Sequence, residues 1–159
     1  MYITVKLVKP NGENPLLVKP EDTFNPGILN LNLKNIGWIE DTGEKIDFYK
    51  LNSDEEDVID YSRDLFKIHY RFKNVLKEKY FYFAIDNSEV SKYLAKHNFY
   101  KLERFYINID NILFIEEEYK LSVTKDKNKV KLFFYLSDGM VLQILTTKSR
   151  WENWKHIRL

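Results

Sequence analysis

The chain has 159 residues, a formal net charge of +1, 44% hydrophobic and 16% aromatic residues, and no cysteine. This length fits one domain, the near-neutral charge argues against a dedicated nucleic-acid binder, and the lack of cysteine excludes disulfides, thiolate nucleophiles and cysteine-ligated zinc. The first residues lack the pattern of a signal peptide, and no apolar run reaches the roughly 18 residues of a membrane helix. We therefore expect a cytoplasmic protein.

The N-terminal part predicts short strands. Tyr2–Val8 alternates apolar and polar residues, and the Pro and Asn-Gly that follow favour a turn. Two further strand-like runs cover 31–33 and 36–40. The segment Asp41-Thr42-Gly43-Glu44 predicts a hairpin turn, with the return strand over 45–51.

The middle of the chain predicts two helices. Ser53 and Glu56 form a capping-box pattern, and apolar residues then recur at steps of three and four up to Val75, which predicts a long helix over 53–79. The apolar run 80–85 is either the end of that helix or a strand. Asn87 or Ser88 can cap a second, short helix over 89–97.

The C-terminal part predicts mostly β structure. Strands are expected over 99–109, 112–123 and 130–136, and Ser137-Asp138-Gly139 predicts a tight turn to a last strand over 140–146. A short helical turn near Ser149 ends the chain.

One segment occurs twice. Leu31–Asp41 aligns with Ile107–Glu117, and five of the eleven pairs are identical. Each copy predicts a strand, a kink marked by Asn, a second strand that ends in acids, and a return strand. Either this hairpin is a favoured way to build a sheet, or it was duplicated and the two copies pack about a pseudo-twofold axis.

These elements predict an α+β fold, with antiparallel sheets built from repeated β-hairpins and one long and one short helix inserted between them. We expect a single domain over 1–159. It would hold a hairpin copy at 31–51, the helices at 53–97 and a β-rich second copy at 99–147.

Charge is unevenly distributed. Nine acids against two bases leave residues 38–60 at −7, whereas residues 63–79 carry +4 from six bases and two acids. Acids near the start and bases near the end of a helix would complement its macrodipole. The alternative is an acidic face that engages a basic partner protein. A metal site is a weaker alternative, because the calcium-loop spacing is absent.

The C-terminal tail interleaves bases with indoles. Basic side chains attract phosphate, and Trp rings stack on nucleobases. This tail could therefore contact nucleic acid through Lys148, Arg150, Trp151, Trp154 and Lys155. The alternative is that Trp151, Trp154 and Ile157, spaced by three, cap the core from one side of a helical turn.

Several chemistries lack their motifs. His69, His97 and His156 are far apart and form no metal-binding pattern, and the chain has no nucleophile elbow, P-loop or dinucleotide-binding glycine motif. We therefore expect a non-catalytic protein with no cofactor and no metal.

Two short segments resemble known families. Tyr93-Leu94-Ala95-Lys96-His97-Asn98-Phe99 is similar to a segment near the end of GNAT-family acetyltransferases, which implies a degenerate acetyltransferase-like enzyme. Asn98 stands where that family has Gly, and the family's glycine loop for acetyl-CoA is missing. The run from Ile109-Asp110-Asn111-Ile112 through Ile115-Glu116-Glu117 to Ser137-Asp138-Gly139 is similar to β-modules of LytTR-like regulators, which implies DNA contact.

The whole chain resembles phage-encoded anti-CRISPR inhibitors of type II effector nucleases. The resemblance rests on small size, a cysteine-free composition rich in Lys, Asn, Ile and Tyr, the lack of catalytic motifs, and the acidic block. It implies a protein in the host cytoplasm that docks on a basic nuclease and blocks DNA cleavage sterically or allosterically. The expected contact residues are Glu40, Asp41, Tyr49, Asp54, Glu55, Asp57, Asp60 and Tyr61. The rival hypothesis is a small nucleic-acid-binding regulator that uses the C-terminal tail.

Overall fold

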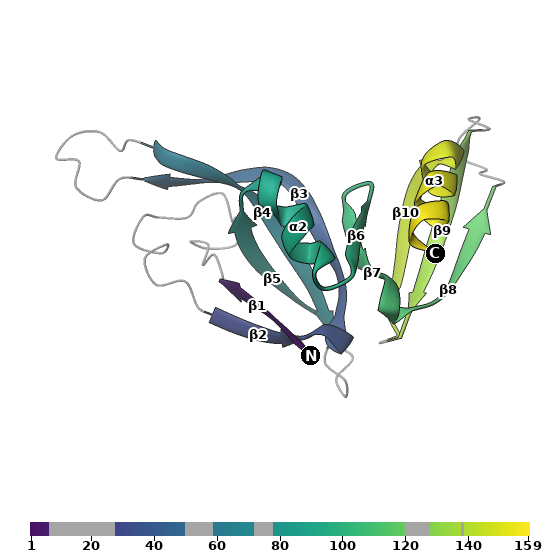
Figure 1. The fold of residues 1–159 in the computed structure, drawn as a ribbon, viewed down its shortest axis with the longest axis horizontal. Helices are drawn as coiled ribbons and strands as arrows, with labels where there is room; N and C mark the ends of the chain where they lie inside the picture. Colours follow the sequence, from purple (N-terminus) through teal and green to yellow (C-terminus); the bar gives the residue numbers. More distant parts are fainter. Residues whose placement is uncertain (7–27, 50–58, 72–77, 120–127, 138) are drawn as a thin grey trace.

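The computed structural model describes residues 1–6, 28–49, 59–71, 78–119, 128–137 and 139–159. Ten strands, two 3₁₀ turns and two α-helices occur in these residues (Figure 1). In chain order they are β1 (Tyr2–Lys6), β2 (Ile28–Asn32), η2 (Leu33–Asn35), β3 (Ile36–Tyr49), β4 (Ile59–Arg71), β5 (Glu78–Ile85), α2 (Asn87–Ala95), β6 (Phe99–Leu102), β7 (Phe105–Asn108), η3 (Ile109–Asn111), β8 (Ile112–Glu118), β9 (Lys129–Leu136), β10 (Val141–Thr147) and α3 (Lys148–Arg158).

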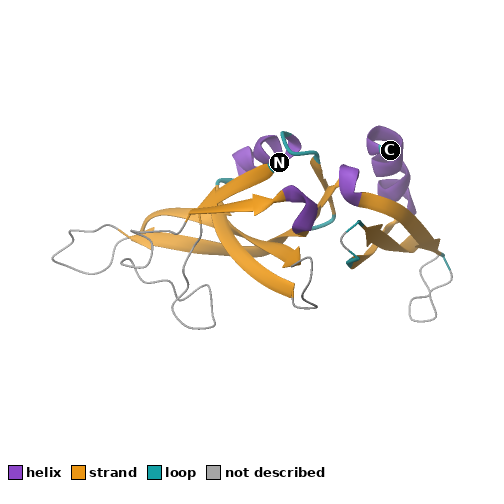
Figure 2. Ribbon diagram, turned by 90° about the horizontal axis from the view of Figure 1, so that it is seen from below, coloured by secondary structure: helices purple, strands orange, loops and turns teal. Residues whose placement is uncertain are grey.

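The strands form three antiparallel sheets. The largest has the order β5-β4-β3-β7-β6, the second has the order β10-β9-β8, and β1 pairs with β2 alone. The helix α2 lies over the large sheet, and α3 lies over the β10-β9-β8 sheet (Figures 1 and 2). The predicted α+β class with antiparallel sheets is confirmed.

Two hydrophobic cores share one end of the large sheet. The first core lies between the large sheet, the β1–β2 hairpin and α2, and the second lies between the β10-β9-β8 sheet, α3 and the β7-β6 end of the large sheet. Neighbouring residues of a strand point to opposite faces, so Ile39 and Tyr106 enter the first core while Trp38 and Ile107 enter the second. This shared end therefore connects the two cores.

The chain contains the same series of elements twice. A hairpin, a 3₁₀ turn, three antiparallel strands and a helix make up the first unit, β1 to α2, and again the second unit, β6 to α3. The turns agree in detail: the side chain of Asn32 accepts a hydrogen bond from the Lys34 N–H, and that of Asn108 accepts one from the Asp110 N–H, each at 3.0 Å. The sequence repeat is the conserved centre of this larger unit.

The two units contact each other head to tail. β3 of the first unit pairs with β7 of the second. A twofold axis would also pair their counterparts, β8 and β2. This pairing does not occur among the described residues. The element order supports a duplicated unit, but the described strand pairs do not fit the alternative in which the two copies pack about a pseudo-twofold axis.

The hairpin turn predicted at residues 41–44 is a β-bulge. Asp41 lies opposite Phe66 and Lys45 lies opposite Asp64, so three residues of β3 face only Leu65. Gly43 has a φ of +76°, which glycine adopts without steric cost, and its N–H donates to the Asp41 carboxylate at 3.0 Å. The turn residues therefore bend one long strand, and residues 45–49 continue β3 instead of returning.

The long helix predicted over 53–79 is also wrong where the structure describes the chain. Residues 59–71 form β4, and 78–79 begin β5. β4 is a central strand with apolar side chains on both faces: Phe66, Ile68 and Tyr70 enter the first core, while Leu65 packs with Ile46 on the other face. Burial on both faces imitates helical spacing. The macrodipole explanation of the charges therefore does not apply to β4, and residues 53–58 and 72–77 lie outside the described residues.

The short helix and the C-terminal helix are confirmed. α2 begins after Asp86, whose carboxylate accepts the Ser88 N–H at 3.0 Å, so the cap precedes the predicted Asn87 or Ser88. α3 begins after Thr147, whose hydroxyl accepts the Arg150 N–H. Both caps use a side-chain oxygen to satisfy an N–H of the first helical turn.

Candidate protein-binding face

The side of the β10-β9-β8 sheet that faces away from α3 exposes apolar and aromatic side chains. In β9 the residues Val130, Leu132, Phe134 and Leu136 are buried, and the alternate residues point to the other side. The strand registers arrange these outward residues in three rows across the sheet. We call this surface the open face; its residues are Phe114, Tyr135 and Val141, then Glu116, Phe133 and Gln143, then Glu118, Lys131 and Leu145.

The first row contains an exposed aromatic stack. The rings of Phe114 and Tyr135 lie 4.3 Å apart between centroids and 17° from parallel, and the side chains of Phe114 and Val141 are exposed. The Tyr135 hydroxyl donates to the Glu116 carboxylate at 3.2 Å. Partial burial raises the pKa of Tyr135, and Glu116 adds to this effect. The stack is therefore held in one orientation by its own sheet.

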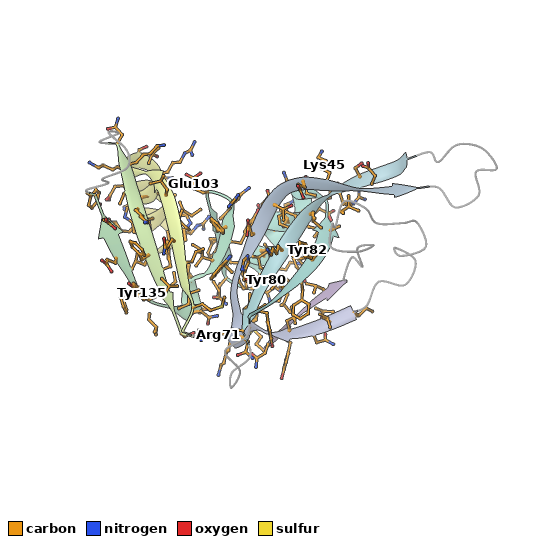
Figure 3. The ribbon with its side chains drawn as sticks, turned by 180° about the vertical axis from the view of Figure 1, so that it is seen from behind. Lys45, Arg71, Tyr80, Tyr82, Glu103 and Tyr135 are labelled. Atoms are coloured by element: carbon orange, nitrogen blue, oxygen red, sulfur yellow. The ribbon has the colours of Figure 1, made fainter. Side chains whose placement is uncertain are left out.

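Aromatic side chains are also exposed on the large sheet. In Figure 3 Tyr135 lies on the second sheet, and Tyr80 and Tyr82 lie on the same side of the large sheet. Lys67 of β4 places its ammonium 4.2 Å from the Tyr80 ring centroid. Exposed Tyr and Phe with a polar rim are typical of protein interfaces, so this side is the candidate binding surface.

In the corresponding row of the first unit, Trp38, His69 and Tyr80, the first two side chains are buried and Tyr80 is exposed. Trp38 occupies the position of Phe114, and it stacks on His69 of the neighbouring strand as Phe114 stacks on Tyr135. Trp38, however, belongs to the second core together with Ile107 and Met140 of the second unit. The second unit thus covers Trp38 of the first unit, whereas Phe114, its counterpart in the second unit, is exposed.

The acids at the end of β8 form a short hydrogen-bonded cluster. Glu117 accepts the Tyr119 hydroxyl at 2.7 Å and the Trp151 indole N–H, and it lies 3.7 Å from the Lys155 ammonium. Glu117 raises the pKa of Tyr119 to about 12, and the hydrogen bond from Tyr119 is the main cause that lowers the pKa of Glu117. Glu116 and Glu118 are exposed beside it, so this end of the open face is acidic.

The predicted contact residues are only partly described, and two of their acids, Glu40 and Asp41, are paired. Glu40 lies 3.0 Å from His69 and 3.5 Å from Arg104, and Asp41 lies 3.4 Å from Lys101. The backbones of Tyr49, Asp60 and Tyr61 belong to β3 and β4. Asp54, Glu55 and Asp57 lie outside the described residues. The chain's own bases therefore offset Glu40 and Asp41, whereas Glu44 of the same acidic block is exposed.

The basic tail folds as α3, and its two indole rings are not accessible to a nucleic acid. Trp151 and Trp154 are buried in the second core, where each packs edge-on against Phe134. Buried rings cannot stack on nucleobases, so the predicted role of these two residues in nucleic-acid contact is wrong. The alternative, packing in the core, is confirmed for both. Ile157, in contrast, is exposed. Arg150 pairs with Glu103 at 3.0 Å, and Lys155 pairs with Glu152 at 3.2 Å.

The acetyltransferase-like and LytTR-like segments have structural roles. Tyr93 donates its hydroxyl to the Thr4 carbonyl at 2.5 Å, and Asn98 turns the chain from α2 into β6 with a φ of 61°. The LytTR-like run begins in η3 and ends at the turn between β9 and β10.

The three histidines belong to different parts of the fold. His69 is buried against Trp38, His97 follows α2 and His156 is exposed on α3. Burial and the Lys96 charge lower the pKa of His97. The described residues contain no group of three or more His, Asp or Glu side chains placed to hold a metal ion.

Comparison with protein-family models, with curated proteins and with solved structures finds no match for this chain. Neither described helix is long and apolar enough to cross a membrane.

Sequence reasoning missed the open face. Its signal was present in Val130–Leu136, where Lys131, Phe133 and Tyr135 alternate with the buried residues. When the outward-pointing residues of a strand are aromatic, they predict a sheet face that another surface covers. Which of the two units is covered within the chain, however, depends on contacts between distant segments.

Proposed function

We propose that the chain is a non-catalytic binding protein and that the open face is where it contacts a partner protein. The observation that carries this proposal is that Phe114 and Val141 of the first row are exposed, whereas Trp38, the counterpart of Phe114, is buried by the second unit. Exposed apolar area in such a row costs hydration free energy, which burial against a partner recovers.

The acids on β8 favour a basic partner. Glu116 and Glu118 line the open face, and Lys131 is the base among its nine residues. Opposite charges across an interface speed association and reject like-charged competitors. A nuclease whose DNA-binding surface is basic fits this description.

The anti-CRISPR resemblance gives the proposal its specific form. The chain would dock on a type II effector nuclease and block DNA cleavage by covering a surface that the DNA or a moving domain needs. The test is DNA cleavage by the purified nuclease and guide RNA with increasing amounts of this protein. Inhibition by the wild type that is lost in the Phe114→Ala, Tyr135→Ala double variant supports the proposal.

A matched control separates the open face from general effects of removing aromatics. Tyr2 is also exposed but lies on β1, so Tyr2→Ala is expected to inhibit like the wild type. The acidic block is a second arm: if reversal of Glu55, Asp57 and Asp60 to Lys abolishes inhibition while the Phe114→Ala, Tyr135→Ala variant keeps it, the contact lies at the acidic block and the open-face proposal fails.

The nucleic-acid alternative has its own outcome. A salt-sensitive mobility shift of labelled DNA by the isolated protein would favour a DNA-binding regulator, with the exposed bases of α3 as the contact. With the two indoles of α3 buried, we expect no such shift at physiological salt.

A further inference from the structure

We infer that the partner binds β8 as an added antiparallel strand, in the same way that β7 binds β3 within the chain, and that this partner segment carries a base beside Glu116. The inference rests on the proposed function and specifies how the partner is recognised.

The contact between the two units supplies the template. Trp38 lies opposite Ile107, Ile39 opposite Tyr106, and Glu40 opposite Phe105. The Asp41 N–H extends this ladder by donating to the Arg104 carbonyl at 2.7 Å.

Bases from the β6–β7 hairpin complete the contact. The Arg104 guanidinium lies 3.5 Å from the Glu40 carboxylate, and the Lys101 ammonium lies 3.4 Å from the Asp41 carboxylate. The template is thus a short apolar strand, Phe105–Asn108, that is preceded by an Arg.

β8 offers the same edge without an occupant among the described residues. Phe114, Ile115, Glu116 and Glu117 are the counterparts of Trp38, Ile39, Glu40 and Asp41, and β8 pairs with β9 on one side alone. The consecutive side chains Leu113 and Phe114 are both exposed, at 65% and 57%. An edge strand with free N–H and C=O groups and apolar side chains is a template for another strand.

Charge selects the occupant. A second β8 has three acids and no Lys or Arg in Ile112–Glu118, so it supplies no base for Glu116. The β2 strand of a second copy has Asn30 where the template has Tyr106, and Thr4 where it has Lys101. An apolar segment of a different protein that carries a base fits the edge better than either.

The probe is a labelled peptide that copies residues 101–109 of this chain, Lys-Leu-Glu-Arg-Phe-Tyr-Ile-Asn-Ile, added to the full-length protein. We expect saturable binding by fluorescence anisotropy, at least about tenfold weaker when the peptide's Arg is replaced by Glu, which corresponds to about 1.4 kcal/mol. Glu116→Lys in the protein is expected to weaken binding similarly. The control Glu44→Lys reverses an exposed charge in the β3 bulge and should leave binding unchanged.

Hydrogen exchange of the backbone locates the contact. Strand addition predicts slower amide exchange across 112–118 when the peptide is bound. No saturable binding at about 1 mM peptide, or binding without protection of 112–118, overturns the inference. A dimer of the free chain by sedimentation, with the same amides protected, assigns the edge to a second copy and also overturns it. If instead the Phe114→Ala, Tyr135→Ala variant stops nuclease inhibition while 112–118 stay unprotected in the complex, the proposed function holds and strand addition alone fails.

Discussion

Trp38 and Phe114 occupy the same position in the two units, yet Trp38 is 9% exposed and Phe114 is 57% exposed. Each ring stacks on the neighbouring strand, Trp38 on His69 at 4.4 Å and Phe114 on Tyr135 at 4.3 Å between centroids. The local stacking is therefore the same in the two units, and the difference is whether another part of the chain packs over the ring. Within this chain the second unit covers the first, which leaves the second unit's row for another molecule.

The packing of the two units depends on the small size of Gly37. A Cβ at this position would lie 2.6 Å from the Met140 Sδ, so Gly37→Ala forces the buried Met140 side chain to move. We expect a loss of about 1–3 kcal/mol in the free energy of unfolding, measured by urea denaturation. Met140→Ala in the same chain should make Gly37→Ala cheaper than it is alone, and additive losses would contradict this contact.

The two Asn turns should respond alike to mutation. Asn32→Ala and Asn108→Ala each remove an acceptor for a backbone N–H at 3.0 Å, with an expected cost of about 0.5–2 kcal/mol in the free energy of unfolding. Asp at either position keeps the acceptor and should restore most of the loss. Calorimetry of the four variants checks this, and a cost at one position alone would argue against equivalent turns.

The indoles of α3 differ in what their N–H groups do. Trp151 donates to the Glu117 carboxylate, whereas the buried Trp154 N–H has no partner in the described part of the chain. Trp151→Phe removes one of the donors to the Glu117 carboxylate, and Trp154→Phe removes an unpaired polar group. We expect Trp151→Phe to cost about 1–2 kcal/mol more than Trp154→Phe; equal costs by urea denaturation would contradict the hydrogen-bond assignment.

Glu117 should link protein stability to pH at both extremes. Its pKa is lowered, so its contribution is present above the pKa of the unfolded chain and is lost as pH falls through the folded value. The pKa of Tyr119 is raised to about 12, so its contribution is present below the unfolded value and is lost as pH rises through about 12. Glu117→Gln should lower the pKa of Tyr119, measured by ultraviolet titration as the difference from Tyr119→Phe. An unchanged pKa would exclude this hydrogen bond.

Local patterns in the sequence predicted the repeated turns and the short elements. Asn32 and Asn108 are identical and fold identically, and the β9–β10 hairpin follows from strict alternation around Gly139. These elements depend on neighbours in the chain, which a sequence displays directly.

Elements that depend on distant segments could not be predicted in this way. β4 reads as a helix because Leu65 and Phe66 are buried on opposite faces by different parts of the chain. The sequence predicts that Glu40 and Asp41 are free to bind a partner, because Arg104 and Lys101, which pair with them, are far away in the sequence. The open face was missed for the same reason, since burial of Trp38 by the second unit is a tertiary effect.

The most direct test of the central claim measures the affinity of this protein for a purified type II effector nuclease by calorimetry. The wild type is compared with the Phe114→Ala, Tyr135→Ala double variant and with Tyr2→Ala as the control. We predict that the double variant weakens binding at least about tenfold, since truncation of central aromatic residues typically costs 1.4 kcal/mol or more, while Tyr2→Ala binds like the wild type. Equal affinity of the folded double variant and the wild type would contradict the assignment of the open face as the binding surface.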